Sequence, residues 1–285
     1  MASQTQAKIV LKELRAEHLV AANALSEEKS WPQRLEDWEL FYELGEGIVA
    51  MQDDRVVGTI LAFRYRDNYA SLGMLIEAAD LRGSNIARTL MIAMLDRLGP
   101  GVNILICGTP ERMSLYYSLG FTPYNIIHQH QGPAPSMPLA VPRDGERVRP
   151  MGKSEPDLAQ IYNTATGIDR SVLFSAFVRD CAGNVLCHDH DPVGFALSRR
   201  FGRGRVIAPI IAPDFEGAKL LATQLLGERA GHFCRIDVVE GHGMSKWLDS
   251  VGLPKVDTAT MMVRGTPPIL PESPTMFAIA AQTYG

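Results

Sequence analysis

The residues best placed to do chemistry in this chain lie in a short segment between an apolar stretch and a helix. The segment reads Glu-Ala-Ala-Asp-Leu-Arg-Gly-Ser-Asn-Ile-Ala-Arg, from Glu77 to Arg88. It follows an expected strand at 69–76 and enters an expected helix, whose apolar residues recur every four positions from Ile86. The first N–H groups of a helix lack intrahelical partners and lie at the positive end of its dipole. Such a strand, Arg-Gly loop and helix predict an anion site, with an ordinary turn before a helix as the alternative.

A second candidate lies downstream, on a short helix that ends in a Gly-Phe turn. The sequence there is Leu-Tyr-Tyr-Ser-Leu-Gly-Phe, from Leu115 to Phe121. The phenol of Tyr116 could donate a proton to a reacting group. Equally, Tyr116 could be a core aromatic that packs beside Leu115 and Leu119.

Together the two motifs resemble those of the GNAT superfamily of N-acetyltransferases. In that family the phosphate loop reads Arg/Gln-x-x-Gly-x-Gly/Ala, which Arg82–Ala87 matches except that Asn85 replaces a glycine. Asparagine tolerates a positive φ better than most residues, so we expect the turn to be kept. The family's downstream Tyr-x-x-x-Gly-Phe motif matches the stretch from Tyr116 to Phe121. The resemblance covers roughly residues 8–131.

The resemblance implies an enzyme that transfers the acetyl group of acetyl-coenzyme A to an amine by direct attack, without a metal. Tyr116 is then the general acid toward the departing thiolate, and a backbone N–H of Met74 or Leu75 stabilises the oxyanion. The pantetheine arm would pair with the strand edge at Met74, Leu75 and Ile76. The loop and the helix start would hold the pyrophosphate through Arg82, Gly83, Ser84, Asn85, Ile86, Ala87 and Arg88.

The general base is less clearly marked. Some GNAT enzymes carry a glutamate in the fourth strand, where this chain has Ser71. His128 and His130 alternate on an expected strand and so share one face. We take His130 as the candidate base, acting directly or through water; a packing histidine and an ordered water chain are the alternatives.

The expected acceptor contacts lie between the first two helices. Glu27 and Glu28 could hold a cationic amine, and Trp31 could pack on its apolar face. A pocket between two domains suits a compact acceptor, namely an amino acid, a polyamine or an amino-sugar antibiotic that acetylation would inactivate. Two alternatives stay open: a protein lysine or N-terminal acetyltransferase, and a non-catalytic acyl-coenzyme A sensor.

The chain also resembles itself. The stretch that begins at Val57 matches the one that begins at Val193, and Ser114–Phe121 matches Lys246–Leu253. Self-similarity over so long a period indicates two copies of one fold unit. We therefore predict a catalytic GNAT domain over 1–132, a Pro-rich linker with little regular structure over 133–150, and a degenerate GNAT-like domain over 151–285.

The first copy shows a regular order of strand and helix patterns, β-α-α-β-β-β-α-β-α-β. Around Asp53-Asp54 two apolar runs flank a turn and predict a hairpin. The expected fold class is α/β (α+β), with two tandem GNAT-like units that each carry a mixed, mostly antiparallel central sheet flanked by helices.

The second copy lacks the residues for catalysis. Leu248 stands at the position of Tyr116 and cannot donate a proton. The loop Pro213–Gly217 is short and acidic, so it would repel a phosphate group. We expect this copy to shape the acceptor pocket or to bury the first copy. The His188–Asp191 run looks like a metal cluster, but the repeat places it at a hairpin tip, where neighbouring side chains alternate faces.

Composition bounds the remaining classes of function. The 285 residues are 46% hydrophobic and 21% charged, with a formal net charge of −4, as in ordinary globular proteins. This charge suits a cationic substrate better than nucleic acid. No apolar stretch is long enough to span a bilayer and no secretory signal is visible. We expect a cytoplasmic enzyme with four reduced cysteines and no membrane partner, as a monomer or a homodimer.

Overall fold

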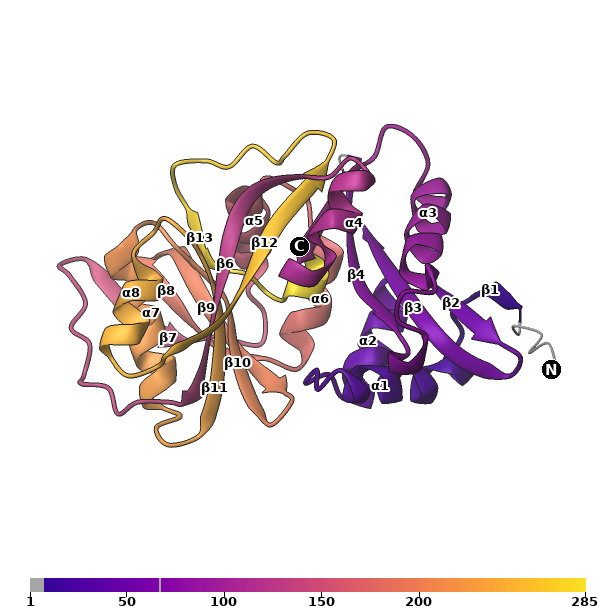
Figure 1. Cartoon of the computed structure of the whole chain (residues 1–285). Helices are drawn as coiled ribbons and strands as arrows, with labels where there is room; N and C mark the ends of the chain where they lie inside the picture. Colours follow the sequence, from indigo (N-terminus) through magenta and orange to yellow (C-terminus); the bar gives the residue numbers. More distant parts are fainter. Residues whose placement is uncertain (1–7, 67) are drawn as a thin grey trace, which may run out of the picture.

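The computed structural model describes residues 8–66 and 68–285, and within these residues the strands join one 13-stranded sheet. Helices cover both faces of this sheet, and the chain forms two units that lie side by side (Figure 1). Across the same residues, no helix combines the length and apolarity that crossing a membrane requires.

The first unit has the order of elements that the sequence predicts. These elements are β1 (Ile9–Glu13), α1 (Leu19–Glu28), α2 (Leu35–Leu44), β2 (Glu46–Gln52), β3 (Arg55–Arg64), β4 (Tyr69–Glu77), α3 (Ile86–Leu98), β5 (Asn103–Gly108), α4 (Met113–Ser118) and β6 (Thr122–Pro133). Short 3-10 helices precede α1, α3 and α4. The predicted fold class, two tandem units built on a mixed and mostly antiparallel sheet, is confirmed.

The second unit repeats this order and adds a C-terminal segment. Its elements are β7 (Glu146–Pro150), α5 (Pro156–Thr166), α6 (Ser171–Arg179), β8 (Ala182–His188), β9 (Asp191–Phe201), β10 (Gly204–Ala212), α7 (Phe215–Gly227), β11 (Phe233–Val239), α8 (Met244–Ser250), β12 (Lys255–Arg264), β13 (Thr275–Ala278) and the 3-10 helix η4 (Gln282–Tyr284). The predicted unstructured linker over 133–150 is wrong at both ends. There β6 reaches Pro133, and β7 pairs with β8 at the edge of the sheet, which satisfies the backbone groups of 146–150 that face β8.

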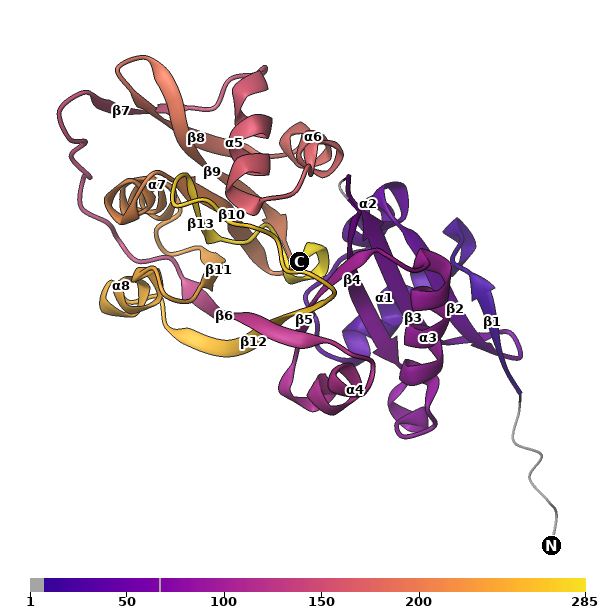
Figure 2. The ribbon, with the colours of Figure 1, turned by 90° about the horizontal axis from the view of Figure 1, so that it is seen from above.

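The two units exchange their last strands. In the sheet β12 lies between β5 and β6, and β6 lies between β12 and β11. Strand β12 pairs antiparallel with β5 from Thr260↔Gly108 to Arg264↔Ile104. Figures 1 and 2 both show β6 and β12 running alongside each other where the units meet. Each unit's sheet is therefore completed by a strand of the other. Residue 132 ends the first unit along the sequence, but the two units are not separated there in the folded protein.

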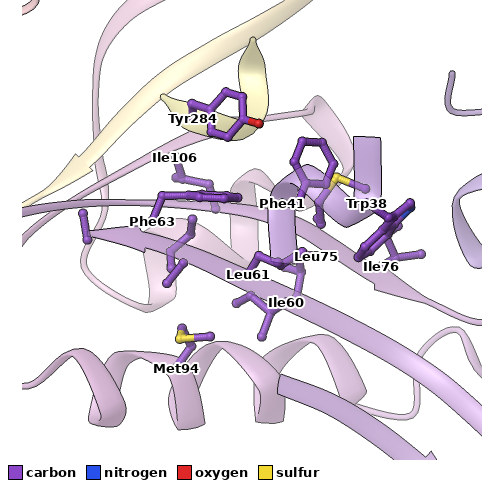
Figure 3. Close-up of a cluster of buried hydrophobic side chains, with 14 of the residues drawn as sticks. Trp38, Phe41, Ile60, Leu61, Phe63, Leu75, Ile76, Met94, Ile106 and Tyr284 are labelled. Carbon is purple, nitrogen blue, oxygen red and sulfur yellow. The ribbon is translucent and has the colours of Figure 1, made fainter. Parts of the chain in front are cut away.

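The C-terminal segment ties the units together a second time. Strand β13 pairs with β10 and β11 of the second unit, and η4 then packs against β4 and β5 of the first. The ring of Tyr284 in η4 is buried in the first unit's core, with ring centroids 4.8 Å from Phe63 and 5.7 Å from Phe41. Figure 3 shows these rings on one face of the sheet and Met94 of α3 on the other. Because both faces are covered, β3 is buried at nearly every position.

The strand exchange generates a prediction about the connection between the units. Leu139 and Val141 are 93% and 87% exposed, so a protease site inserted there should be cut in the folded protein. We expect the two pieces to co-elute in size-exclusion chromatography and to unfold in one calorimetric transition, because β12 stays paired with β5 and β6. The uncut protein with the same insertion is the control, and separation of the pieces without denaturant would contradict the exchange.

Candidate active site

The centre of the site is the place where β4 and β5 part. The two strands pair in parallel only from Tyr69↔Asn103 to Leu72↔Ile106, although both continue beyond this point. At Met74 the backbone turns to φ +51° and the register with β3 shifts, which marks a β-bulge. The hydroxyl of Thr59 donates to the Met74 carbonyl at 2.8 Å and holds the bulge. The result is a wedge with free strand edges, as expected for Met74, Leu75 and Ile76.

The predicted phosphate loop opens beside this wedge. Gly83 has φ +84°, and nothing lies within 4 Å of the place where a Cβ would stand. Asn85 precedes α3 in the left-handed region, at φ +63°, so the turn is kept without the family's glycine. The first turn of α3 holds no acidic residue, and no side chain caps its N-terminus. Backbone N–H groups at the positive end of a 13-residue helix therefore face an open loop.

Positive side chains surround the same loop. Arg82 and Arg88 belong to the predicted motif, and the Arg88 guanidinium donates to the Ser118 hydroxyl of α4 at 2.8 Å. Lys29 and Arg112, which the sequence did not single out, come from the ends of α1 and of the turn before α4. Burial lowers the pKa of Lys29, and the charges of Arg82 and Arg112 lower it further. The cluster carries excess positive charge and fits a phosphate-bearing ligand.

Two carboxylates, Glu77 and Glu111, balance part of this charge. Glu77, the last residue of β4, is buried and accepts a hydrogen bond from Arg112 at 2.9 Å. This ion pair joins the end of β4 to the segment that follows β5, on the side where the strands have parted. Sequence reasoning missed it because the two residues lie 35 positions apart and follow no periodic pattern.

Tyr116 lies on α4 beside the wedge. Its ring is 4% exposed and packs close to Gly108, the last residue of β5, where an added Cβ would come within 3.1 Å of the ring. The ring centroid of Phe121 is 6.0 Å away. Burial raises the pKa of Tyr116 above its ordinary value of 10.0, so the phenol is protonated at neutral pH. Tyr116 is thus a core aromatic whose protonation state also suits a proton donor.

His130 lies elsewhere, and its prediction as the base is wrong. Its side chain is fully buried, with one ring nitrogen 2.8 Å from the Leu253 carbonyl and the other 2.9 Å from the Ser245 hydroxyl of α8. Burial also lowers its pKa. The exchange of β6 into the second unit carries His130 away from β4, so both nitrogens serve the packing of α8. At the family's glutamate position, Ser71 is buried and hydrogen-bonded to the Tyr65 hydroxyl at 2.9 Å.

The predicted acceptor residues do not line the cavity at the junction of the units, which is described next. Glu27 and Glu28 are exposed at the end of α1, where Glu27 accepts a hydrogen bond from Asn23 at 2.8 Å. Trp31 is half-buried against the core of the first unit. The loop that carries it meets the second unit, because a Cβ on Gly202 would come within 2.7 Å of Pro32. This segment forms part of the junction between the units rather than a lining of the cavity described next.

A cavity of about 180 Å³ lies at the junction, on the sheet face that η4 covers. Met261 of β12 lines it and is paired with Cys107 at the end of β5, so the cavity lies one strand from the wedge. Its other walls come from β6, the end of α5 and the segment 268–276. Gly285 lines it as well, and the backbone of Thr283 lies within 3.0 Å of where a Cβ on Gly73 would be. The C-terminal segment therefore reaches from the cavity to the bulge of β4.

The second unit has the same parting of strands, but it is filled. Strands β10 and β11 pair only at Arg205↔Cys234 and Val206↔Arg235, and β13 then lies between them. At the start of α7 the Asp214 carboxylate accepts a hydrogen bond from the Gly217 N–H at 2.9 Å. This side chain caps the helix and places a negative charge where a bound anion would lie. Leu248, at the position of Tyr116, is fully buried.

Comparison with known proteins agrees with this geometry in both halves. A model described as the acetyltransferase (GNAT) family matches residues 11–121, and one described as an acetyltransferase (GNAT) domain matches residues 159–278. No curated protein matches the sequence.

Solved structures show the same fold over nearly the whole chain. A putative acetyltransferase from Pyrococcus horikoshii is similar with a TM-score of 0.79 at 17% identity, covering 100% of this chain and 98% of that one. A GCN5-related N-acetyltransferase from Sphaerobacter thermophilus reaches 0.67 at 14% identity, covering 93% and 98%. A tandem GNAT protein from the clavulanic acid biosynthesis pathway reaches 0.66 at 12% identity, covering 91% and 99%. With a GNAT match over each half, the chain belongs to the GNAT superfamily as an acyltransferase with two GNAT domains in tandem.

Proposed function

We propose that this acyltransferase moves the acetyl group of acetyl-coenzyme A to the primary amine of a small molecule, and that only the first unit is catalytic. The observation that carries the proposal is the difference between the two wedges. In the first unit the parted strands lie beside an uncapped helix N-terminus and a positive cluster. In the second unit β13 and Asp214 take up the corresponding places.

The residues of the first unit then divide the work. The edge of β4 from Met74 to Ile76 would pair with the pantetheine arm, and the N–H groups that open α3 would bind the pyrophosphate with Arg82 and Arg88. A backbone N–H at the bulge would stabilise the oxyanion. Tyr116 would donate its proton to the departing thiolate.

Direct attack by the amine, without a covalent acyl-enzyme, is consistent with the protonated thiol of Cys107 at the end of β5. Burial raises the pKa of Cys107 to about 12, so this thiol stays protonated and is a poor nucleophile near neutral pH. With His130 engaged in the second unit, water would take the proton that the amine loses on attack.

The acceptor is proposed to be compact because the cavity at the junction is small and is bounded by elements of both units. It would be an amino acid, a polyamine or an amino sugar, with the enzyme working in the cytoplasm without a metal, a membrane or nucleic acid. The test is acetyl-coenzyme A binding by calorimetry, followed by thiol release over these three amine classes. Turnover of one class supports the proposal. Binding with turnover only of peptide lysines or N-termini would replace it with a protein acetyltransferase, and no binding would end it.

Tyr116→Phe tests the proton donor. Loss of the hydroxyl should lower kcat by about 10²-fold, because positioned acid catalysis contributes roughly that much, and should leave acetyl-coenzyme A affinity unchanged. Tyr117→Phe, on the exposed neighbour, is the matched control and should have wild-type kcat. Equal kcat in the two variants would remove Tyr116 from the chemistry.

The pH profile supplies a second test of the same residue. Because burial places the pKa of Tyr116 above 10.0, its protonated form persists through neutral and mildly alkaline pH. Between pH 6 and pH 9 we expect kcat/KM to rise as the acceptor amine loses its proton, with no descending limb. A descending limb centred below pH 9 in the wild type that vanishes in Tyr116→Phe would show that this pKa is not raised.

A pair of substitutions at one position tests the phosphate loop. Asn85→Asp puts a carboxylate at the positive end of the α3 dipole, which it stabilises, but the carboxylate repels a phosphate, so we expect unchanged or raised thermal stability and at least about tenfold weaker acetyl-coenzyme A binding. Asn85→Gly restores the family's residue in a left-handed turn and should bind at least as tightly as the wild type. Calorimetry and thermal melts measure both, and undiminished binding by Asn85→Asp would place the phosphates elsewhere.

A further inference from the structure

We propose that Arg170 of the second unit is a positioning residue for the acceptor site, because it fixes the C-terminal segment 279–285 as a wall of that site. The proposal rests on the proposed function and extends it to a residue outside the catalytic unit. It also gives the second unit a specific task, which is to hold this segment against β4.

Arg170 stands in the turn between α5 and α6 and is 4% exposed. Its Nη1 donates to the main-chain oxygens of Tyr284 at 3.0 Å and Gly285 at 2.6 Å. Its guanidinium lies over the ring of Tyr65, 4.6 Å from the centroid. Among the described residues no Asp or Glu side chain forms an ion pair with it. A buried cation whose Nη1 is directed to two main-chain oxygens of one segment is suited to fixing that segment.

The first unit holds the same segment from the other side. The Tyr65 hydroxyl donates to the Tyr284 carbonyl at 2.7 Å, so this oxygen receives hydrogen bonds from both units. Burial raises the pKa of Tyr65 to about 12, which keeps its hydroxyl a donor throughout the working range of pH. The ring of Tyr284 is anchored 5.1 Å from Phe177 of α6 as well as in the first unit's core.

The C-terminal segment also contacts β4 and the cavity, which are the proposed places of the reaction. The backbone of Thr283 lies against Gly73, one residue before the bulge, and the Thr283 hydroxyl is 3.8 Å from the Met74 sulfur. Gly285 and Arg170 both line the cavity at the junction. Displacement of the segment would therefore alter the cavity and this face of β4, while Met94 of α3 lies on the opposite side of the sheet (Figure 3).

The test compares Arg170→Met and Arg170→Lys with Arg179→Gln. Arg179 is the matched control, because it also joins the units, through Glu43 at 2.6 Å, but does not touch the segment. With the best amine found in the acceptor panel, we expect Arg170→Met to raise the amine KM at least about tenfold, with the acetyl-coenzyme A Kd unchanged. Arg170→Lys keeps a cation and should recover part of the loss. Arg179→Gln should match the wild type.

Hydrogen exchange gives a readout that needs no turnover. In Arg170→Met the amides of 279–285 should exchange faster, while those of α3 keep wild-type protection. If Arg170→Met does not fold, Tyr65→Phe and Arg170→Lys decide the matter, since each weakens the anchor without removing a buried charge. An amine KM equal to that of Arg179→Gln, an equal loss of cofactor binding, or unchanged exchange of the segment would overturn the proposal. Absence of turnover in the wild type would instead overturn the proposed function, and the exchange measurement would still stand.

Discussion

The site depends on one constraint, which is that β4 and β5 pair over only four residues before they part. Unpaired strand edges inside a protein must find other partners, because buried N–H and C=O groups are costly to leave unsatisfied. The second unit meets this demand from within, by laying β13 between β10 and β11. In the first unit no strand is inserted between the described parts of β4 and β5, and under the proposed function a ligand meets this demand. One geometric feature thus has two outcomes, an inserted strand in one copy and an open wedge in the other.

The electrostatics of the two helices that follow the wedges diverge in the same way. At α7 the Asp214 side chain satisfies a backbone N–H and pairs with Arg143 at 2.8 Å, so charge and hydrogen bonds are both balanced. At α3 the N-terminus has no side-chain cap and faces Arg82, Arg88 and Lys29. Burial lowers the pKa of Lys29 most, and the nearby charges of Arg82 and Arg112 lower it further, as happens at sites where charged groups are brought together.

Local patterns in the sequence predicted those parts of the site that are formed by contiguous residues. The strand, loop and helix around Arg82 and the helix that carries Tyr116 are contiguous, so spacing and turn residues were enough to place them. His130 was misplaced because strand exchange depends on partners more than 100 positions away, which no periodicity records. The same holds for Arg170 and for the segment that ends at Gly285. Glu146–Pro150 was missed because this short, mostly charged edge strand lacks the alternation of apolar residues by which central strands are found.

The strand exchange also bears on how the protein is made. A ribosome delivers residues 1–132 long before β12, yet β5 and β6 meet only through β12. During synthesis the edge of β5 that pairs with β12 stays unpaired until about half of the chain has been added. The sheet of the first unit is therefore complete only after residues 255–264 have been synthesised. Synthesis of β12 and β13 supplies the last strands of the sheet in both units.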